Sequence, residues 1–304
     1  MQEKNVVLVF YATTFLHPGS GSTTGTVDLP VQREVHTDFP YAAGSGLKGS
    51  LREKAERNGE NGEKDPRVVI VFGPETGGAE ESAYAGCLSV GDARLLAMPV
   101  RSVTNTFMWT TCPLVLQRLA RDAEIAGIEL NLVAPRPIEN SQAFVPAGAG
   151  LPDILVLEDV DFRVSESNEA SAIAQEIAQK LLPGSIGPHY FEKFKRDFVI
   201  LSDNRFSYFA RYGTQVSARI ALNERKTTTG DGGNLWYEET IPPETVFYSI
   251  LMARKPRSPQ AASDIKDARD VMDYLSGTVL SDGFLRIGGN ETVGQGWCLV
   301  RAVS

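Results

Sequence analysis

The sequence predicts an α+β fold, in which helices cover a largely antiparallel sheet and strands and helices follow one another without strict βα alternation. Three observations support this class. Segments that alternate between apolar and polar residues, rich in β-branched and aromatic types, recur through the chain and predict strands. Segments with helical periodicity lie irregularly between them. Two alternating segments flank a polar, glycine-bearing stretch at residues 223–234, a pattern typical of a β-hairpin with a long tip.

The individual elements can be placed in chain order. We expect strands at residues 6–15, one or two strands within 86–99, and further strands at 155–164, 198–202, 216–222, 235–241, 245–253 and 297–303. We expect helices from Ser45 to about residue 58 and over residues 113–126, 170–182, 188–194 and 262–275. The apolar run 68–72 fits either a strand or a helical turn. Turn-forming residues predict inserted loops at about 58–86 and 131–152.

The composition limits the class of protein. The chain has 304 residues, of which 42% are hydrophobic, enough for the core of one large domain or two ordinary ones. The net charge of −8 argues against coating nucleic acid through bulk charge, although a local basic groove remains compatible with it. The cysteines lack metal or disulfide spacing and fit buried thiols in a reducing compartment. We find no membrane-spanning run or signal peptide, and therefore expect a cytoplasmic protein.

A glycine-rich stretch over residues 17–52 organises the rest of the chain. It leaves the first predicted strand and re-enters the fold where Gly-Ser-Gly at 44–46 opens a helix. The first turn of a helix has unpaired N–H groups and a partial positive charge, so it can hold a phosphate. Basic residues four apart share one face of that helix. The residues expected to contact a phosphate are Ser45, Gly46, Lys48 and Arg52. The alternative is a tight turn followed by a solvated basic face.

A second glycine-rich segment covers residues 288–296. It precedes a strand and opens no helix, so it is neither a dinucleotide-binding fingerprint nor a P-loop. Successive N–H groups in such a loop can still cradle an anion. The alternative is a plain loop before an edge strand. The residues expected to contact a bound strand are Gly289, Asn290, Gly294 and Gln295.

The tip and return strand of the predicted hairpin combine cations with aromatic residues. This combination suits RNA, whose bases stack on aromatic rings while its phosphates pair with cations. The alternative is a solvated tip with the tryptophan in the core. The residues expected to contact RNA here are Arg225, Lys226, Asn234 and Trp236.

Asp28 is the carboxylate of the opening loop, and His17 and His36 flank it. A pair of histidines could cut RNA by general acid–base chemistry, because each titrates near neutral pH. Asp28 could instead hold a divalent ion or orient an attacking 2′-hydroxyl group. The simpler alternatives are that Asp28 bonds its own backbone in a turn and that His17 is structural.

Four motifs together resemble the RAMP superfamily of CRISPR proteins. They are Val-Asp-Leu-Pro-Val-Gln-Arg-Glu at 27–34, Gly-Ser-Gly-Leu-Lys-Gly-Ser-Leu-Arg at 44–52, Gly-Asn-Leu-Trp-Tyr-Glu-Glu at 233–239, and Ile-Gly-Gly-Asn-Glu-Thr-Val-Gly-Gln-Gly at 287–296. The first and the last are similar to the family of fourth subunits that form the repeating backbone of type III-B (Cmr) complexes. The resemblance extends over almost the whole chain.

The resemblance implies a single RAMP-type domain over residues 1–304. Its modified RRM- or ferredoxin-like palm would cover about 1–213 and 242–304, and its β-hairpin thumb about 214–241. The RRM's usual aromatic RNA-binding motif is not apparent in this sequence.

The resemblance also implies a function. Such a subunit would bind CRISPR guide RNA, assemble with further copies of itself and with other Cmr subunits, and cleave a bound target RNA at regular intervals with a divalent cation, Mg²⁺ or Mn²⁺. The family's catalytic aspartate falls on Asp28, its guide-binding lysine on Lys48, and a loop histidine with a supporting role on His17. The alternatives are a non-catalytic scaffold that binds guide RNA and a metabolic enzyme that binds a nucleotide with the glycine loops.

Overall fold

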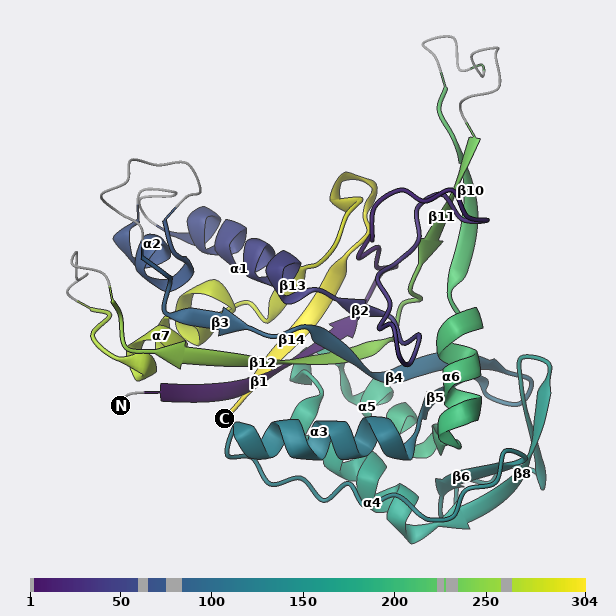
Figure 1. The fold of residues 1–304 in the computed structure, drawn as a ribbon. Helices are drawn as coiled ribbons and strands as arrows, with labels where there is room; N and C mark the ends of the chain where they lie inside the picture. The colour runs from purple at the N-terminus through teal and green to yellow at the C-terminus, as the bar shows by residue number, and fades with distance from the viewer. Residues whose placement is uncertain (1–2, 60–64, 75–83, 223–226, 228–234, 258–263) are drawn as a thin grey trace.

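The computed structural model describes residues 3–59, 65–74, 84–222, 227, 235–257 and 264–304. Its main feature is a long antiparallel run of strands in the order β13-β14-β1-β12-β4 (Figure 1). The first strand, β1 (Glu3–Ala12), pairs with both β12 (Val246–Arg254) and β14 (Trp297–Val303). Its continuous apolar run fits this central position, because a strand covered on both faces needs no polar alternation.

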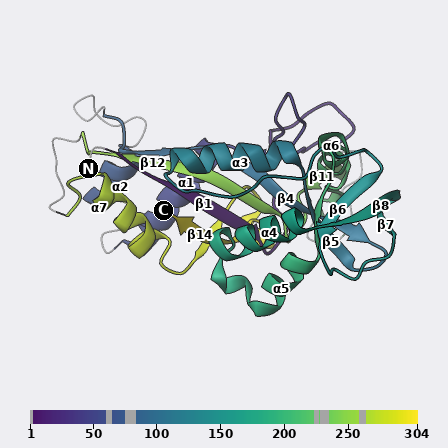
Figure 2. The same ribbon diagram turned by 90° about the horizontal axis from the view of Figure 1, so that it is seen from below.

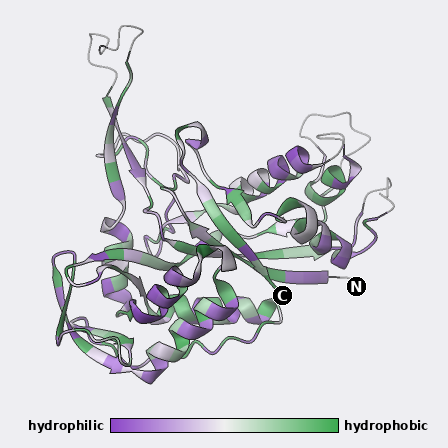
Figure 3. Cartoon of the chain, turned by 180° about the vertical axis from the view of Figure 1, so that it is seen from behind, coloured by the Kyte–Doolittle hydropathy of each residue, from purple (hydrophilic) through white to green (hydrophobic). Residues whose placement is uncertain are grey.

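Helices cover both faces of this sheet (Figures 1 and 2). One face carries α1 (Gly44–Asn58), α2 (Pro66–Phe72) and α7 (Ala268–Tyr274), and the other carries α3 (Pro113–Ile125), α4 (Asn168–Glu176) and α5 (Pro188–Arg196). Proline occupies the start of α2, α3 and α5, where a missing N–H costs no hydrogen bond. Figure 3 shows that hydrophobic residues concentrate in the central strands that these helices cover.

A smaller ring of strands continues from β4 (Ala93–Ser102). The order is β4, β5 (Thr106–Thr111), β9 (Phe198–Ile200), β6 (Gln142–Pro146), β8 (Val160–Ser167) and β7 (Ile154–Leu157). Pairing of Ser102 with Leu157 brings β7 back to β4 and closes the ring. A separate apolar cluster fills it, and Phe209 of α6 (Asp203–Tyr212) belongs to that cluster.

The hairpin of β10 (Gln215–Ile220) and β11 (Leu235–Thr240) forms a two-stranded sheet of its own and projects from the body of the molecule (Figure 1). Directly paired residues lie on the same face of such a ribbon. Arg219 and Trp236 are paired and share one face, while Ile220 and Leu235 share the other. The last three residues of β11 are buried where the hairpin joins the body.

The remaining elements are short. They are β2 (Tyr41–Ala42), β3 (Leu88–Val90) and β13 (Phe284–Arg286), π-helical turns at Ile177–Leu181 and Leu275–Val279, and 3₁₀ turns at Gly184–Ile186 and Glu291–Val293. The three cysteines are free and buried. Within the described part of the chain, no helix is both long enough and apolar enough to cross a lipid bilayer.

The mixed α/β fold, the first and last strands, the hairpin and the helices beginning near residues 45, 113, 170 and 188 confirm the sequence predictions. The run 68–72 is helical and forms all of α2 after its first two residues. The helix expected at 262–275 begins at Ala268, because the Asp267 side chain caps it.

Two predictions were wrong. The region expected to be one strand at 155–164 is the β7–β8 hairpin, which turns at Glu158 with a positive φ of 51°. The expected loop 131–152 contains β6, whose Ala143 and Val145 enter the second apolar cluster. Neither β5 nor α6 was expected from the sequence.

Candidate nucleic-acid interface

The two glycine-rich segments meet because of how β1 and β14 pair. These strands are antiparallel, so Ala12 at the end of β1 lies opposite Cys298, the second residue of β14. The loop after β1 therefore runs beside the loop before β14. The Gly289 N–H donates to the His17 carbonyl at 2.9 Å, and the Gly296 N–H donates to the Phe15 carbonyl at 2.8 Å. Folding thus places the two glycine-rich segments side by side.

Close backbone approach explains the glycine at position 288. Its φ is +86°, and a Cβ built there would lie 2.6 Å from the His17 carbonyl oxygen. A side chain at this position would push the two loops apart.

A groove of about 260 Å³ opens where these loops reach the amino end of α1. Its walls come from the opening loop, the first turns of α1 and the second glycine segment; they are Pro18, Gly19, Gln32, Ala42, Ala43, Gly46, Leu47, Ser50, Ile287, Gly288 and Gly289. Two predicted contact residues, Gly46 and Gly289, line it directly. Ser45 is exposed at the same end of α1.

The first turn of α1 retains free donors at this groove. Asp92 accepts from the Gly44 N–H at 2.7 Å, and the Gln32 carbonyl side chain accepts from the Ala43 N–H at 2.8 Å. The next amides, of Ser45 and Gly46, donate to no residue that the structure describes. These amides, at the positive end of the helix dipole, suit an anionic ligand.

Lys48 and Arg52 share one flank of α1, as their spacing predicts, but this flank is not the one that lines the groove. It faces Cys87 and Gly73. Arg52 donates to the Glu56 carboxylate at 2.7 Å and to the Gly73 carbonyl at 2.9 Å. The Lys48 ammonium has no hydrogen bond or ion pair among the described residues. Burial lowers its pKa, and the nearby Arg52 lowers it further.

Asp28 is half-buried at the side of the hairpin. Its Oδ2 accepts from the backbone N–H of Tyr237 at 2.7 Å. Backbone bonds of Leu29 to Tyr237 and of Glu239 to Leu29, each 3.0 Å, align the opening loop along β11. The other carboxylate oxygen makes no hydrogen bond to a described residue, so it can accept one from a ligand.

The two histidines of the opening loop have different surroundings. His17 is buried, and its Nδ1 lies 2.7 Å from the Glu239 carbonyl oxygen. His36 is exposed and lies beside the Glu34 carboxylate at 3.8 Å. The structure therefore gives no support to a catalytic histidine pair, and it places His17 as a link between the loop and the hairpin.

Residues of the second glycine segment form hydrogen bonds to side chains of the hairpin. The Asn290 side-chain amide donates to Glu238, which also forms an ion pair with Arg219 at 3.4 Å. Gln295 is buried, and with its amide oxygen facing Arg219 it accepts from Nη2 at 3.1 Å. Gly294 ends the 3₁₀ turn with a left-handed φ of +83°. Trp236 is half-buried on β11.

Arg225, Lys226 and Asn234 lie outside the described residues. Their predicted contacts with RNA remain predictions.

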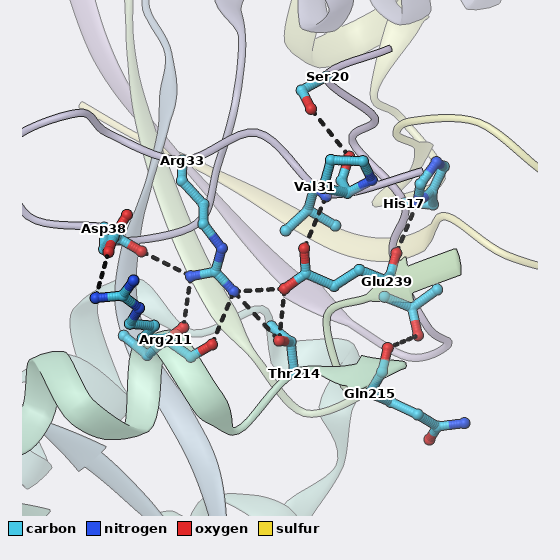
Figure 4. Close-up of polar contacts among 12 residues, drawn as sticks. His17, Ser20, Val31, Arg33, Asp38, Arg211, Thr214, Gln215 and Glu239 are labelled. Carbon is cyan, nitrogen blue, oxygen red and sulfur yellow. Dashed lines mark hydrogen bonds and ion pairs between the residues drawn. The ribbon is translucent and has the colours of Figure 1, made fainter. Parts of the chain in front are cut away.

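The sequence reasoning missed the roles of the Gln-Arg-Glu residues that follow Asp28. Gln32 donates to the Gly19 carbonyl at 3.0 Å, and Glu34 accepts from Arg118 of α3 at 2.7 Å. Arg33 reaches the carboxylate of Glu239 on β11 (Figure 4). Their place inside one motif was the available signal, but the partners of Arg33 and Glu34 are far away in the sequence.

The described residues do not form a resident metal site. No group of three or more histidine, cysteine, aspartate or glutamate side chains among them has the geometry to hold an ion. Asp28 offers a single carboxylate, and one of its oxygens is already bonded to Tyr237.

Comparisons with known proteins show which family the chain belongs to. A family model described as the RAMP superfamily matches residues 9–299, and the chain belongs to this superfamily. It is 35% identical over 297 residues to the CRISPR system Cmr endoribonuclease Cmr4 of Pyrococcus furiosus, an alignment that covers 98% of this chain and 95% of that protein. It is 23% identical to the CRISPR system CMR subunit Cmr4 of Saccharolobus solfataricus, with 94% and 92% covered.

Solved structures show the same fold. The crystal structure of oligomeric Cmr4 from Pyrococcus furiosus superposes with a TM-score of 0.70 at 28% identity and covers 99% of this chain and 98% of that one. A chain in the cryo-EM structure of the type III-B Cmr-beta complex bound to cognate target RNA gives a TM-score of 0.74 at 18% identity, with 98% and 96% covered.

Proposed function

We propose that this chain is a repeating backbone subunit of a type III-B CRISPR effector, which binds guide RNA and cleaves the bound target RNA. The observation that carries the proposal is the meeting of both glycine segments at the amino end of α1, with half-exposed Asp28 at the adjacent hairpin. The Pyrococcus furiosus relative, matched over nearly its full length, is named an endoribonuclease.

The guide strand would pass over the amino end of α1. Its phosphates would meet the amides of Ser45 and Gly46 and, on the far flank, the ammonium of Lys48, groups that no described residue binds. The main sheet with its helices would serve as the palm of a modified RRM-like fold, and the β10–β11 hairpin as the thumb. The thumb would lie between guide and target, beside Asp28.

Asp28 would act on the target strand. Its free oxygen can accept the proton of a 2′-hydroxyl, whose oxygen then attacks the adjacent phosphorus while the bond to the 5′-oxygen breaks. The leaving oxygen takes a proton from water. The products would be a 2′,3′-cyclic phosphate and a 5′-hydroxyl end.

Cleavage would also use a divalent cation, Mg²⁺ or Mn²⁺, which would bind together with the RNA. Mg²⁺ keeps several waters and is commonly held by one or two carboxylates together with phosphate oxygens. A single carboxylate such as Asp28 fits that situation better than a resident site. Cleavage assays with and without chelator test this dependence.

Asp28→Asn tests the catalytic assignment. In a reconstituted complex with guide RNA, this variant should bind a labelled complementary RNA as tightly as wild type but cut it at least about 100-fold more slowly. Binding and cutting are measured on the same preparation. Undiminished cutting would overturn the assignment, and a wild-type complex that binds but never cuts would define a non-catalytic scaffold.

A further inference from the structure

A buried ion pair connects the opening loop, the end of α6 and the hairpin (Figure 4). Arg33 Nη2 lies 2.5 Å from Glu239 Oε1, and the two side chains are only 17% and 9% exposed. Such burial excludes most solvent screening, so removing either partner would leave the other charge buried without compensation. Because one partner lies in the Asp28 loop and the other on β11, the pair links the two elements that surround the Asp28 carboxylate.

Two further bonds of Arg33 attach this link to the end of α6, and a bond to Asp38 stays within the opening loop. Its Nη1 donates to the carbonyls of Asp38 at 2.7 Å and Ala210 at 2.9 Å, and its Nη2 donates to that of Arg211 at 3.1 Å. The last carbonyls of a helix are unpaired and carry partial negative charge, so a guanidinium caps them well. The hairpin begins directly after α6, so Arg33 also fixes the base from which the hairpin projects.

Both oxygens of the Glu239 carboxylate accept hydrogen bonds in this arrangement. Its Oε1 also accepts from Thr214 at 2.6 Å, and its Oε2 accepts from the Val31 N–H at 3.0 Å. Burial raises the pKa of the Glu239 carboxyl, but the bonds from Thr214 and Arg33 outweigh burial, and the pKa lies below its ordinary value. The group therefore stays ionised at neutral pH.

We propose that Arg33 and Glu239 are positioning residues, whose ion pair fixes the Asp28 carboxylate relative to the hairpin. The proposal rests on the proposed function, in which the hairpin docks on RNA and Asp28 acts on the target. Val31 is bound to the Glu239 side chain three residues after Asp28, and Tyr237 is bound to Asp28 two residues before Glu239. Loosening the pair frees the loop to shift along β11. A shift of about 1 Å at a reacting group can slow a reaction about 100-fold.

The chain provides a matched control. Glu34 lies in the same loop and pairs with Arg118 of α3 at 2.7 Å, and these side chains are 14% and 11% exposed. Glu239→Gln and Glu34→Gln therefore each remove one charge from an equally buried pair. Only the first pair connects the loop to the hairpin.

The test uses the reconstituted complex with guide RNA and a labelled complementary RNA. Glu239→Gln and Arg33→Lys should each lower the cutting rate at saturating target about 10- to 100-fold with unchanged target affinity. Glu34→Gln should cut within about threefold of wild type. The double variant should be no slower than the slower single variant, because the two residues act as one unit. Equal rates for Glu239→Gln and Glu34→Gln, or a loss confined to affinity, would overturn the proposal.

Hydrogen exchange gives a readout that does not depend on cutting. The amides of Leu29 and Val31 donate to the Tyr237 carbonyl and the Glu239 carboxylate. They should exchange at least about tenfold faster in Glu239→Gln and at the wild-type rate in Glu34→Gln. Unchanged exchange would overturn the positioning role. Wild-type cutting by Asp28→Asn, with this exchange difference intact, would overturn the catalytic assignment alone.

Discussion

Lys48 differs from the other cations of α1 because the described residues leave its charge unpaired. Arg52 is bonded to Glu56 and Gly73, and Lys54 is bonded to Asp282 at 2.5 Å. An unpaired ammonium at the end of a helix that presents free amides is available to an RNA phosphate.

Lys48→Ala should therefore weaken RNA binding regardless of base sequence. Loss of one phosphate contact should also reduce the slope of log affinity against log salt concentration by about one unit. Fluorescence anisotropy at several salt concentrations measures both effects. Lys54→Ala is the control on the same helix and should leave the slope unchanged. An equal slope for Lys48→Ala and wild type would contradict the assignment.

Asp197 makes the clearest prediction about pH and stability. It is fully buried and accepts from Arg196 at 2.8 Å, from Asn105 at 2.8 Å and from Lys193. Burial raises the pKa of this carboxyl, but its bonds to Arg196 and Lys193 outweigh burial and hold the pKa below its ordinary 3.8.

A depressed pKa in the folded state stabilises the protein above the unfolded pKa, and this contribution is lost as pH falls through the folded value. Asp197→Asn should lower the free energy of unfolding by about 3–5 kcal/mol at pH 7, because it leaves the buried ammonium of Lys193, only 12% exposed, without the carboxylate that it is bonded to. The deficit should shrink below about pH 4. Denaturant unfolding between pH 7 and pH 3 measures it, and a deficit that is constant with pH would contradict the explanation.

At the scale of elements, the amino end of α1 can pack against the β3–β4 turn only because residue 44 is glycine. A Cβ at Gly44 would lie 2.4 Å from the Val90 carbonyl oxygen, a contact with backbone that cannot yield. Gly49, one turn further along the same helix, would meet nothing within 4 Å.

Gly44→Ala should destabilise the protein by about 1–3 kcal/mol and move the end of α1 away from the β3–β4 turn. Gly49→Ala should instead stabilise it by up to about 1 kcal/mol, since alanine is the better helix former. Thermal unfolding of the two variants decides between these expectations. Because α1 forms one wall of the groove, Gly44→Ala should also weaken RNA binding. Similar melting temperatures for the two variants would count against this packing argument.

The elements that could be predicted are those with a local signal. Leu47, Leu51 and Ala55 recur at helical spacing, and all three are buried under α1 as expected. The β10–β11 hairpin alternates on both sides of a glycine-bearing tip. In contrast, the turn between β7 and β8 contains neither glycine nor proline. The alternation of apolar and polar residues therefore continues through the turn and predicts a single strand. In α6, Phe206, Phe209 and Ala210 have helical spacing and Ser202 caps the helix, but its several aromatic residues are also typical of strands.

The candidate site could be predicted only in part, for a related reason. The glycine segments and Asp28 have local motifs, but the groove that brings Gly46 and Gly289 together arises only from the fold. Spacing showed that Lys48 and Arg52 share a flank, but the direction of that flank is set by packing against Cys87 and Gly73. The Arg33–Glu239 pair joins residues 206 positions apart, and no local pattern indicates it.

At the scale of the whole molecule, the net charge of −8 conflicts with RNA binding unless binding is local and repeated. The hairpin supports association, because its exposed residues include Ile220, Leu222 and Leu235, each more than half exposed. A two-stranded ribbon with such a surface is marginally stable alone and gains stability from a covering partner. Several copies on one RNA would also turn weak single contacts into strong overall binding.

Assembly on RNA should therefore depend on RNA length. Light scattering with guide RNAs of increasing length should show the mass of the complex rising in steps of one protein subunit. Asp28→Asn should give the same steps, since it changes chemistry and not binding, whereas Lys48→Ala should need more protein to reach each step, because every copy contributes one phosphate contact fewer. A mass that stays at one subunit for all lengths would remove the basis for a repeating backbone, while leaving the single-site chemistry of Asp28 to be tested by itself.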